Sequence, residues 1–326
     1  MPGPDRIRWG LVIHGGVGVL PEEDLTPDLE RAYREALTRS LQAGHAALQE
    51  GKAEDGVVEA IRVMEDSPLF NAGRGSNVGA DGRVTMDASI MTGEDLAAGA
   101  VAEVTTVRNP IELARMVMEG SPNVFMVGAG AEAFARLNGI DVTPNQWFVT
   151  ERRLRALEAA AAREAAGDGT PNVLGRPADV PLPKPDPPTR FAGTVGAVAL
   201  DREGRICAGT STGGMANKRF GRIGDSPVIG AGTYASDLCG VSCTGWGEYF
   251  IRNAVAHDVA ARMAYLEVPL GEAVDQVIHG SLQDQRPGLG GLVALSRDGT
   301  VVMDFNTAGM YRGRMDQDGA LEVGIY

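Results

Sequence analysis

The sequence predicts an α+β fold in which sheets and helices stack in layers. Two observations indicate it. Strand-like and helix-like segments come in blocks instead of alternating strictly, and glycine clusters mark points where the backbone turns tightly or approaches another segment. The 326 residues, 44% hydrophobic and 22% charged, provide enough apolar side chains for a large core. Length alone allows one large domain or two small ones, and no internal repeat divides the chain.

The elements of the first half follow from hydrophobic periodicity. Residues 8–14 predict a buried strand that ends in a glycine turn. Residues 26–50 predict a long amphipathic helix with Thr26 as its N-cap, and residues 55–65 predict a second helix. We then expect strands at 84–90 and 101–107, followed by helices at 110–118, 131–137 and 151–166.

Residues 167–190 differ from the rest of the chain, because their prolines and polar residues cannot form a periodic element that faces a core. We interpret them as a flexible linker. Strand patterns resume directly after the linker. The expected strands are 194–200, 206–212, 238–243, 292–296 and 301–305, and the expected helices are 248–265 and 270–279.

The composition excludes several functions. A formal net charge of −13, with no basic cluster, opposes binding to nucleic-acid phosphates or anionic lipid. The apolar run 11–13 is too short for a signal peptide or a membrane span, so we expect a cytoplasmic protein with no nucleic-acid or membrane partner. Three cysteines, an odd number, indicate buried thiols instead of a disulfide framework. The four histidines lack paired metal-ligand spacing, so we expect no catalytic zinc or other catalytic cofactor.

The junction of Gly193 and Thr194 is where the linker runs into a strand that begins with a hydroxyl. An internal threonine is a poor nucleophile, because nothing nearby must accept its proton. Scission before Thr194 frees an α-amino group with a pKa of about 7.7 to 8.0, so one residue supplies both nucleophile and general base. Glycine at 193 suits a strained scissile turn. Taken alone, the junction is weak evidence, because it is more typical of an ordinary loop that enters a strand.

Motifs along nearly the whole chain add the context that the junction lacks. They are IHGG at 13–16, PLFNAG at 68–73, MDASIM at 86–91, GAVA at 99–102, GTVGAVALD at 193–201, TSTGGM at 210–215, GRIGDSP at 221–227, CTG at 243–245, GGL at 290–292 and FNTAGMYRG at 305–313. In this order the sequence resembles the plant-type L-asparaginase and isoaspartyl peptidase family of N-terminal-nucleophile (Ntn) hydrolases. The Gly-Thr junction resembles this branch more than the glycosylasparaginases, in which an aspartate precedes the nucleophile.

The resemblance implies a fold and a maturation step. The fold is a four-layer αββα sandwich of the Ntn-hydrolase type, formed as a single domain by residues 1–326. Autocleavage gives an α chain, 1–193, and a β chain, 194–326, and two αβ units form a homodimer. The substrates are L-asparagine or β-aspartyl dipeptides.

The resemblance also implies roles for individual residues. Thr194 attacks the side-chain carbonyl carbon of the substrate, and Thr212 on the following strand forms a hydrogen bond near it. Thr244 and Gly245 form the oxyanion hole, where loss of one donor typically costs about a hundred- to a thousandfold in rate. Gly247 lines the substrate pocket.

Arg222 and Asp225 make chemical sense as a pair. An L-aspartyl head presents an α-carboxylate and an α-ammonium, so the guanidinium of Arg222 can bind the first and Asp225 the second. A surface ion pair of little consequence is the alternative for an isolated Arg-x-x-Asp. The resemblance implies that Asn71 positions the nucleophile or assists self-cleavage, while Asp87 serves to bind buried backbone.

The resemblance implies a structural sodium ion bound by backbone carbonyls of the loop 64–74, at Met64, Glu65, Ser67, Phe70, Ala72 and Arg74. Trp246 departs from the family pattern, in which smaller or polar residues are common. At the pocket mouth its indole would select leaving groups; alternatively, it packs into the core or a subunit contact. Two other functions remain open: a glycosylasparaginase-like hydrolase, and a non-maturing binding protein on the same fold.

Overall fold

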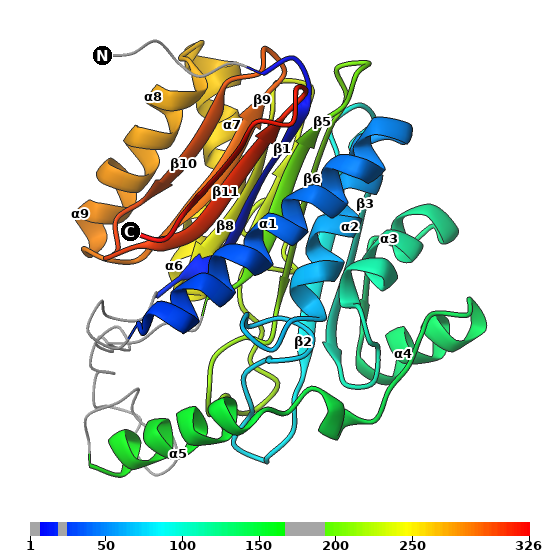
Figure 1. The fold of residues 1–326 in the computed structure, drawn as a ribbon, viewed down its shortest axis with the longest axis vertical. Coiled ribbons are helices and arrows are strands. Elements are labelled where there is room, and N and C mark those ends of the chain that lie inside the picture. Colours follow the sequence, from blue (N-terminus) through cyan, green and yellow to red (C-terminus); the bar gives the residue numbers. More distant parts are fainter. Residues whose placement is uncertain (1–6, 19–24, 167–192) are drawn as a thin grey trace.

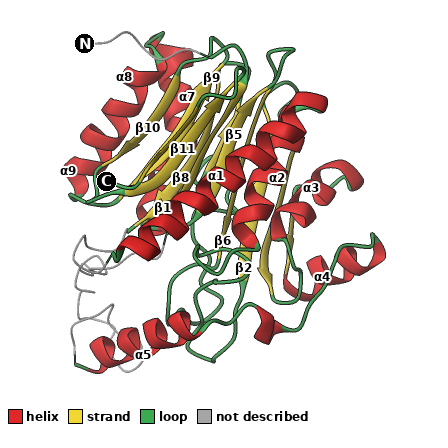
Figure 2. Ribbon diagram, in the orientation of Figure 1, coloured by secondary structure: helices red, strands yellow, loops and turns green. Residues whose placement is uncertain are grey.

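The computed structural model describes residues 7–18, 25–166 and 193–326; the predicted linker 167–190 lies outside the described residues. Two sheets face each other, and helices cover the outer face of each (Figure 1). Figure 2 shows the same four layers, with strands between two groups of helices. This is the predicted α+β sandwich.

The larger sheet has eight strands and mixes the two parts of the chain that flank the linker. Its order is β12-β11-β1-β5-β6-β2-β3-β4, and all neighbours are antiparallel except β3 and β4. In sequence order the strands are β1 (Gly10–Val17), β2 (Met86–Thr92), β3 (Ala98–Val104), β4 (Phe125–Val127), β5 (Val195–Leu200), β6 (Ile206–Thr212), β11 (Met310–Asp316) and β12 (Leu321–Gly324).

The smaller sheet is antiparallel, in the order β10-β9-β8-β7. Its strands are β7 (Thr233–Ala235), β8 (Cys239–Gly245), β9 (Gly290–Ser296) and β10 (Val301–Phe305). Buried apolar residues fill the space between the sheets, with Val12 and Val198 from the larger sheet and Val293 and Leu295 from the smaller one. Burial of such side chains contributes roughly 1.5 to 3 kcal/mol each, so this layer holds the two sheets together.

In the described part of the chain, the helices that cover the outer face of the larger sheet include α1 (Pro27–Glu50), α2 (Ala53–Glu65) and α3 (Pro110–Gly120). Thr26 caps α1 as predicted, because its hydroxyl accepts the N–H of Leu29 at 3.3 Å. The apolar stripes of these helices join one core with strand residues such as Ile13 and Ala197. Beyond them lie α4 (Gly128–Leu137), the 3₁₀ turn η2 (Asn145–Trp147) and α5 (Glu151–Ala165), with α5 at the lower end of the view in Figure 1.

The helices on the smaller sheet correct two predictions. The single helix expected over 248–265 is two helices, α6 (Gly247–Asn253) and α7 (Val255–Leu266), because Ala254 between them takes a left-handed conformation with φ of 47°. The second expected helix begins as α8 (Leu270–Asp275) but continues as a π-helix over Gln276–Leu282 and ends in α9 (Gln283–Gln285). Hydrophobic periodicity does not detect either irregularity, since both helices keep an apolar face.

Strands β4, β7, β11 and β12 were not predicted. Strand β11 contains Arg312, Gly313 and Arg314, which do not form an apolar run. Arg314 pairs with Glu322 of β12 at 2.8 Å. Pairing with β1 on its other side makes this segment a strand, and no local signal predicts that contact.

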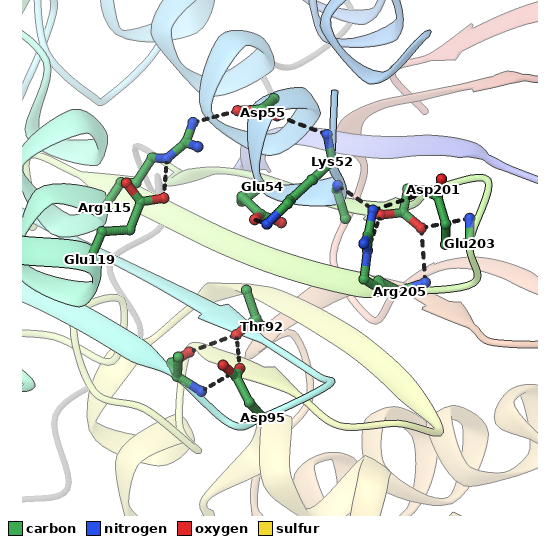
Figure 3. A network of polar contacts seen from close by, with 12 residues as sticks. Lys52, Glu54, Asp55, Thr92, Asp95, Arg115, Glu119, Asp201, Glu203 and Arg205 are labelled. Carbon is green, nitrogen blue, oxygen red and sulfur yellow. Dashed lines mark hydrogen bonds and ion pairs between the residues drawn. The ribbon is translucent and has the colours of Figure 1, made fainter. Parts of the chain in front are cut away.

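Polar contacts fix the far end of the β5–β6 hairpin, which carries Thr194 and Thr212 at its other end (Figure 3). The buried carboxylate of Asp201 accepts the backbone N–H of Arg205 at 2.9 Å and its side-chain Nε at 2.7 Å. The same carboxylate accepts the N–H of Ala53 at 3.3 Å, which joins the hairpin to the start of α2. Among the described residues, no helix is both long and apolar enough to cross a membrane.

Candidate active site

Thr194 lies immediately before β5, on the wall of a cavity of about 370 Å³. The cavity is lined from loops, strands and helix α5; its walls include Asn71, Thr212, Arg222, Asp225 and Gly245. The structure therefore brings together most of the residues that the sequence singled out, although they are spread over more than 170 positions of the chain.

The hydroxyl of Thr194 contacts a second threonine. Its Oγ1 donates to Oγ1 of Thr212 at 3.1 Å, and both side chains are almost fully buried. Thr212 is the last residue of β6, the antiparallel neighbour of β5, so strand pairing sets this contact. The N–H of Gly214 also donates to Thr212 Oγ1, at 3.0 Å. Thr212 thus has a fixed orientation toward the nucleophile.

Thr244 comes from the smaller sheet and reaches the backbone of the nucleophile. Its Oγ1 accepts the N–H of Thr194 at 3.3 Å and the N–H of Val17 at 3.2 Å. Gly245, the next residue of β8, lines the cavity. Two hydroxyls therefore flank Thr194, one from each sheet, and the site lies where the sheets meet.

The backbone around the predicted scissile bond is packed tightly against β1. A Cβ at Gly193 would lie 2.3 Å from Cα of Gly16, and a Cβ at Gly16 would lie 2.5 Å from Cα of Gly193. Gly16 also has φ of 105°, which side chains rarely tolerate. The segment before Thr194 fits against the strand only because both positions are glycine.

Arg222 and Asp225 lie on the cavity wall as expected for recognition of an aspartyl head. The guanidinium is held by a residue that the sequence reasoning missed: Nε and Nη2 each donate to the Glu248 carboxylate at 2.9 Å. Burial raises the pKa of Asp225 to about 7, although the positive charge of Arg222 opposes this. Within the described chain, Oδ2 of Asp225 has no hydrogen-bond partner. A buried carboxylate oxygen on a cavity wall suits a cationic ligand group.

Gly247 lies against this pair. A Cβ there would lie 2.9 Å from Oδ1 of Asp225 and 3.0 Å from Nη2 of Arg222. The glycine therefore leaves room for both side chains. Its predicted role in the substrate pocket stays a prediction. Glu248 follows it in the first turn of α6, where an acidic residue also suits the helix dipole.

Asn71 ties the loop after α2 to the turn that follows Thr212. Its Nδ2 donates to the carbonyl of Gly214 at 2.8 Å, and its Oδ1 accepts the N–H of Asn77 at 2.7 Å. Lys218, which the sequence reasoning also missed, donates from Nζ to the carbonyl of Gly213 at 3.0 Å. These contacts act on the backbone next to the two threonines, so they position the site.

Asp87 binds buried backbone, as predicted. It sits opposite Thr212 in the pairing of β2 with β6, and Oδ1 accepts the N–H of Glu103 at 2.9 Å. Glu103 takes a positive φ of 56° at an irregularity of the β2–β3 pairing. The carboxylate therefore satisfies an N–H that the disturbed strand pairing leaves without a regular partner.

The loop predicted to bind sodium is closed by its own backbone. The carbonyl of Glu65 accepts the N–H of Arg74, and the carbonyl of Met64 accepts the N–H of Ser67 at 3.2 Å. A carbonyl oxygen has a second lone pair, so these bonds are compatible with an additional hard cation. Sodium stays a prediction.

Trp246 does not face the pocket mouth. Its side chain is 3% exposed and packs in the core beneath the outer helices of the smaller sheet. The indole meets Tyr249 edge-on, with ring centroids 5.4 Å apart, and Arg286 lies 5.8 Å from it. Trp246 is the residue before α6, so the start of that helix turns its side chain away from the cavity. The alternative of core packing is therefore correct.

Comparison with known proteins identifies the family. A family model described as asparaginase matches residues 7–325. The chain belongs to this family. Asparaginases of this family are Ntn hydrolases, which agrees with the layered fold and with a threonine at the start of β5.

Individual relatives of this asparaginase-family chain cover between three quarters and nearly all of it. It is 44% identical to a probable isoaspartyl peptidase/L-asparaginase 2 from Arabidopsis thaliana, over 98% of this chain and 99% of the relative. It is 43% identical to an isoaspartyl peptidase from Escherichia coli, over 97% of this chain and 95% of the relative. With a plant-type L-asparaginase from Pyrococcus horikoshii it shares 45% identity over 76% of each chain.

Proposed function

We propose that the chain is a threonine-dependent amidohydrolase. It cuts itself between Gly193 and Thr194 and then hydrolyses L-asparagine, β-aspartyl (isoaspartyl) dipeptides, or both. The observation that carries this proposal is the hydrogen bond from Oγ1 of Thr194 to Oγ1 of Thr212, at 3.1 Å. It lies on the wall of the cavity that Arg222 and Asp225 also line. Relatives named isoaspartyl peptidase and L-asparaginase support the choice of substrates.

Maturation uses the same hydroxyl. Oγ1 of Thr194 attacks the carbonyl carbon of Gly193, the C–N bond breaks, and the hydroxyl proton passes to the departing nitrogen. Water then hydrolyses the resulting ester and leaves a carboxylate on Gly193 and a free α-amino group on Thr194. The tight packing of Gly193 against Gly16 supports the step, because it fixes the scissile carbonyl close to the strand.

Substrate hydrolysis follows from the free amino group. The amine, with a pKa near the working pH, accepts the Thr194 hydroxyl proton while Oγ1 attacks the side-chain amide carbon. Thr244 and Gly245 stabilise the oxyanion, and an acyl-Thr194 ester forms as ammonia or an amino acid leaves. Water completes the reaction and releases aspartate. Arg222 binds the α-carboxylate, and Asp225 the α-ammonium.

Denaturing electrophoresis tests the maturation step. Fragments of roughly 20 and 14 kDa are expected from a 34.2 kDa chain, and N-terminal sequencing of the smaller should begin at Thr194. Thr194→Ala should leave one full-length, inactive chain. A stable single band with full activity after long incubation at neutral pH rejects the proposal and favours other chemistry on this fold. An inert, uncut protein points to a binding role.

The leaving group is tested separately. We propose that free asparagine and β-aspartyl dipeptides are hydrolysed and that N-acetylglucosaminyl-asparagine is not; the reverse preference assigns a glycosylasparaginase-like activity. We also propose a cytoplasmic homodimer of αβ units with a sodium ion on the carbonyls of the loop 64–74. Sedimentation tests the homodimer. A comparison of the thermal unfolding temperature in sodium and in tetramethylammonium salts tests the sodium ion.

A further inference from the structure

His14 occupies a position that the proposed chemistry does not use. It is fully buried in β1, opposite Gly196 in the pairing with β5. Its Nδ1 lies 3.0 Å from the backbone carbonyl oxygen of Thr194, and its Nε2 lies 2.9 Å from Oγ of Ser242. The imidazole therefore joins the nucleophile's own backbone to the smaller sheet.

The chemistry of the two contacts fixes the tautomer. A carbonyl oxygen can only accept, so Nδ1 must carry a hydrogen. Burial lowers the pKa of His14 to about 3, against a smaller opposing effect of the Thr194 contact, so the ring is neutral in the working range. Nε2 is then bare and can accept a hydrogen bond from the Ser242 hydroxyl, whose proton also has the carbonyl of Gly209 within reach at 3.0 Å.

A chain of buried hydroxyls extends from Ser242 across the space between the sheets. Ser242 Oγ lies 2.7 Å from Oγ1 of Thr210, and Thr233 Oγ1 donates to Thr210. Ser89 Oγ lies 2.8 Å from Oγ1 of Thr233. Thr233 donates to Thr210, and Thr210 can donate to Ser242, which leaves the Ser242 proton for Nε2 of His14 or for the carbonyl of Gly209, 3.0 Å away.

The strand next to His14 leaves room for this arrangement. A Cβ at Gly196 would lie 2.0 Å from Oγ of Ser242 and 2.4 Å from Nε2 of His14. Any side chain two residues after the nucleophile would displace the bond between them. The opposite end of the chain is also near the site, since Ser89 Oγ lies 2.6 Å from the carbonyl of Ser226, the residue after Asp225.

We propose that His14 is a positioning residue for the nucleophile: its Nδ1–H holds the carbonyl of Thr194, and Ser242 keeps the ring in the tautomer that can do so. The proposal rests on the role of Thr194 proposed above. Fixing the Thr194 peptide fixes the direction of its side chain and keeps the hydroxyl against Thr212. Because His14 does not contact the substrate cavity, it acts on kcat and leaves KM unchanged.

Two variants of equal polarity separate the contacts. In His14→Asn the side-chain amide nitrogen takes the place of Nδ1 and keeps the donor to Thr194. In His14→Gln the amide takes the place of Nε2, so the contact with Ser242 is kept and the donor to Thr194 is lost. We expect kcat near the wild-type value for His14→Asn and a loss of about 10- to 100-fold for His14→Gln, with KM unchanged in both. Equal kcat in the two variants, or an effect confined to KM, would overturn the proposal.

A measurement on the wild-type protein does not depend on either variant folding. ¹⁵N spectra of histidine-labelled protein report the tautomer. The His14 signals are assigned as those that are missing from the spectrum of His14→Asn. If that variant does not fold, they are assigned as those that shift in Ser242→Ala. We expect protonated Nδ1 and bare Nε2 from neutral pH down to pH 5; protonated Nε2 overturns the proposal. The spectrum requires no turnover, so failure of the proposed hydrolysis is distinguished from failure of this inference.

Discussion

At the residue scale, the site depends on a few buried polar atoms whose surroundings set their charge. Asp225 is 4% exposed, and Nε and Nη2 of Arg222 both donate to the carboxylate of Glu248. In the proposed complex, removal of either side chain leaves one charge of the bound substrate without its partner. The pair should therefore contribute to binding in a way that a surface ion pair does not.

The pH dependence of catalysis should report Asp225. Its raised pKa of about 7 means that protonation on the acid side removes the anion that binds the α-ammonium. The value of kcat/KM reports ionisations of the free enzyme. It should fall as the pH decreases through about 7, because both the Asp225 carboxylate and the Thr194 amine become protonated. In the saturated enzyme the bound ammonium keeps Asp225 ionised, so only the Thr194 amine titrates. The plot of log kcat against pH should therefore have the slope expected for a single protonation. Parallel slopes in both profiles would contradict this assignment.

Substitution of Arg222 should weaken binding of the transition state for substrate hydrolysis without blocking maturation. In the proposed reaction the guanidinium binds the α-carboxylate and not the scissile bond, so Arg222→Ala should cost about 2 to 5 kcal/mol in kcat/KM while both fragments still form. Arg222→Lys should recover only part of the loss, because the planar fork is absent. Near-normal hydrolysis of L-asparagine by Arg222→Ala would show that the arginine is structural.

At the scale of elements, strand ends determine where the chemistry lies. Thr194 precedes β5, Thr212 ends β6 and Thr244 is the next-to-last residue of β8. Ends of strands leave the ladder of hydrogen bonds, so their side chains and backbone are free to face a cavity while the strands themselves stay rigid. The start of α6 then places Glu248 beside Arg222 and directs Trp246 into the core.

Trp246→Ala should lower stability without changing substrate preference. The indole is buried beneath the outer helices, and its removal leaves a cavity that typically costs about 3 to 5 kcal/mol. Urea denaturation measures the loss, and Trp246→Phe, which keeps an aromatic ring, should lose less. Relative kcat/KM among β-aspartyl dipeptides with different leaving residues should stay the same; a reordered series would place the indole at the cavity.

At the scale of the whole molecule, the two proposed fragments are interleaved. Strand β1 of 1–193 lies between β11 and β5 of 194–326, and β6 of 194–326 pairs with β2 of 1–193, so the larger sheet cannot be divided into one block from each fragment. The apolar layer between the sheets also draws on both fragments. The proposed scission would therefore free the amino group of Thr194 without dividing the core.

The fragments should consequently remain together after cleavage. Size-exclusion chromatography of mature protein is expected to give one peak that contains both chains, and separation should require the denaturant concentration that unfolds the protein. Thr194→Ala, which stays uncut, serves as the control and should elute at the same volume. Loss of the smaller chain under native conditions would contradict the interleaved sheet as the structure of the mature enzyme.

The sequence by itself determined the local elements and the chemistry of the junction. Helix 26–50 with its Thr26 cap, strand 206–212 and the hydroxyl that begins the strand after the linker all follow from periodicity and neighbouring residues. The family motifs added the residues of the site. Tertiary structure decided which of these residues meet. The contacts of Thr194 with Thr244, of Arg222 with Glu248 and of His14 with Ser242 join separate elements. A side-chain pattern fixes which face of an element is buried, but the packing of whole sheets selects the neighbour on that face.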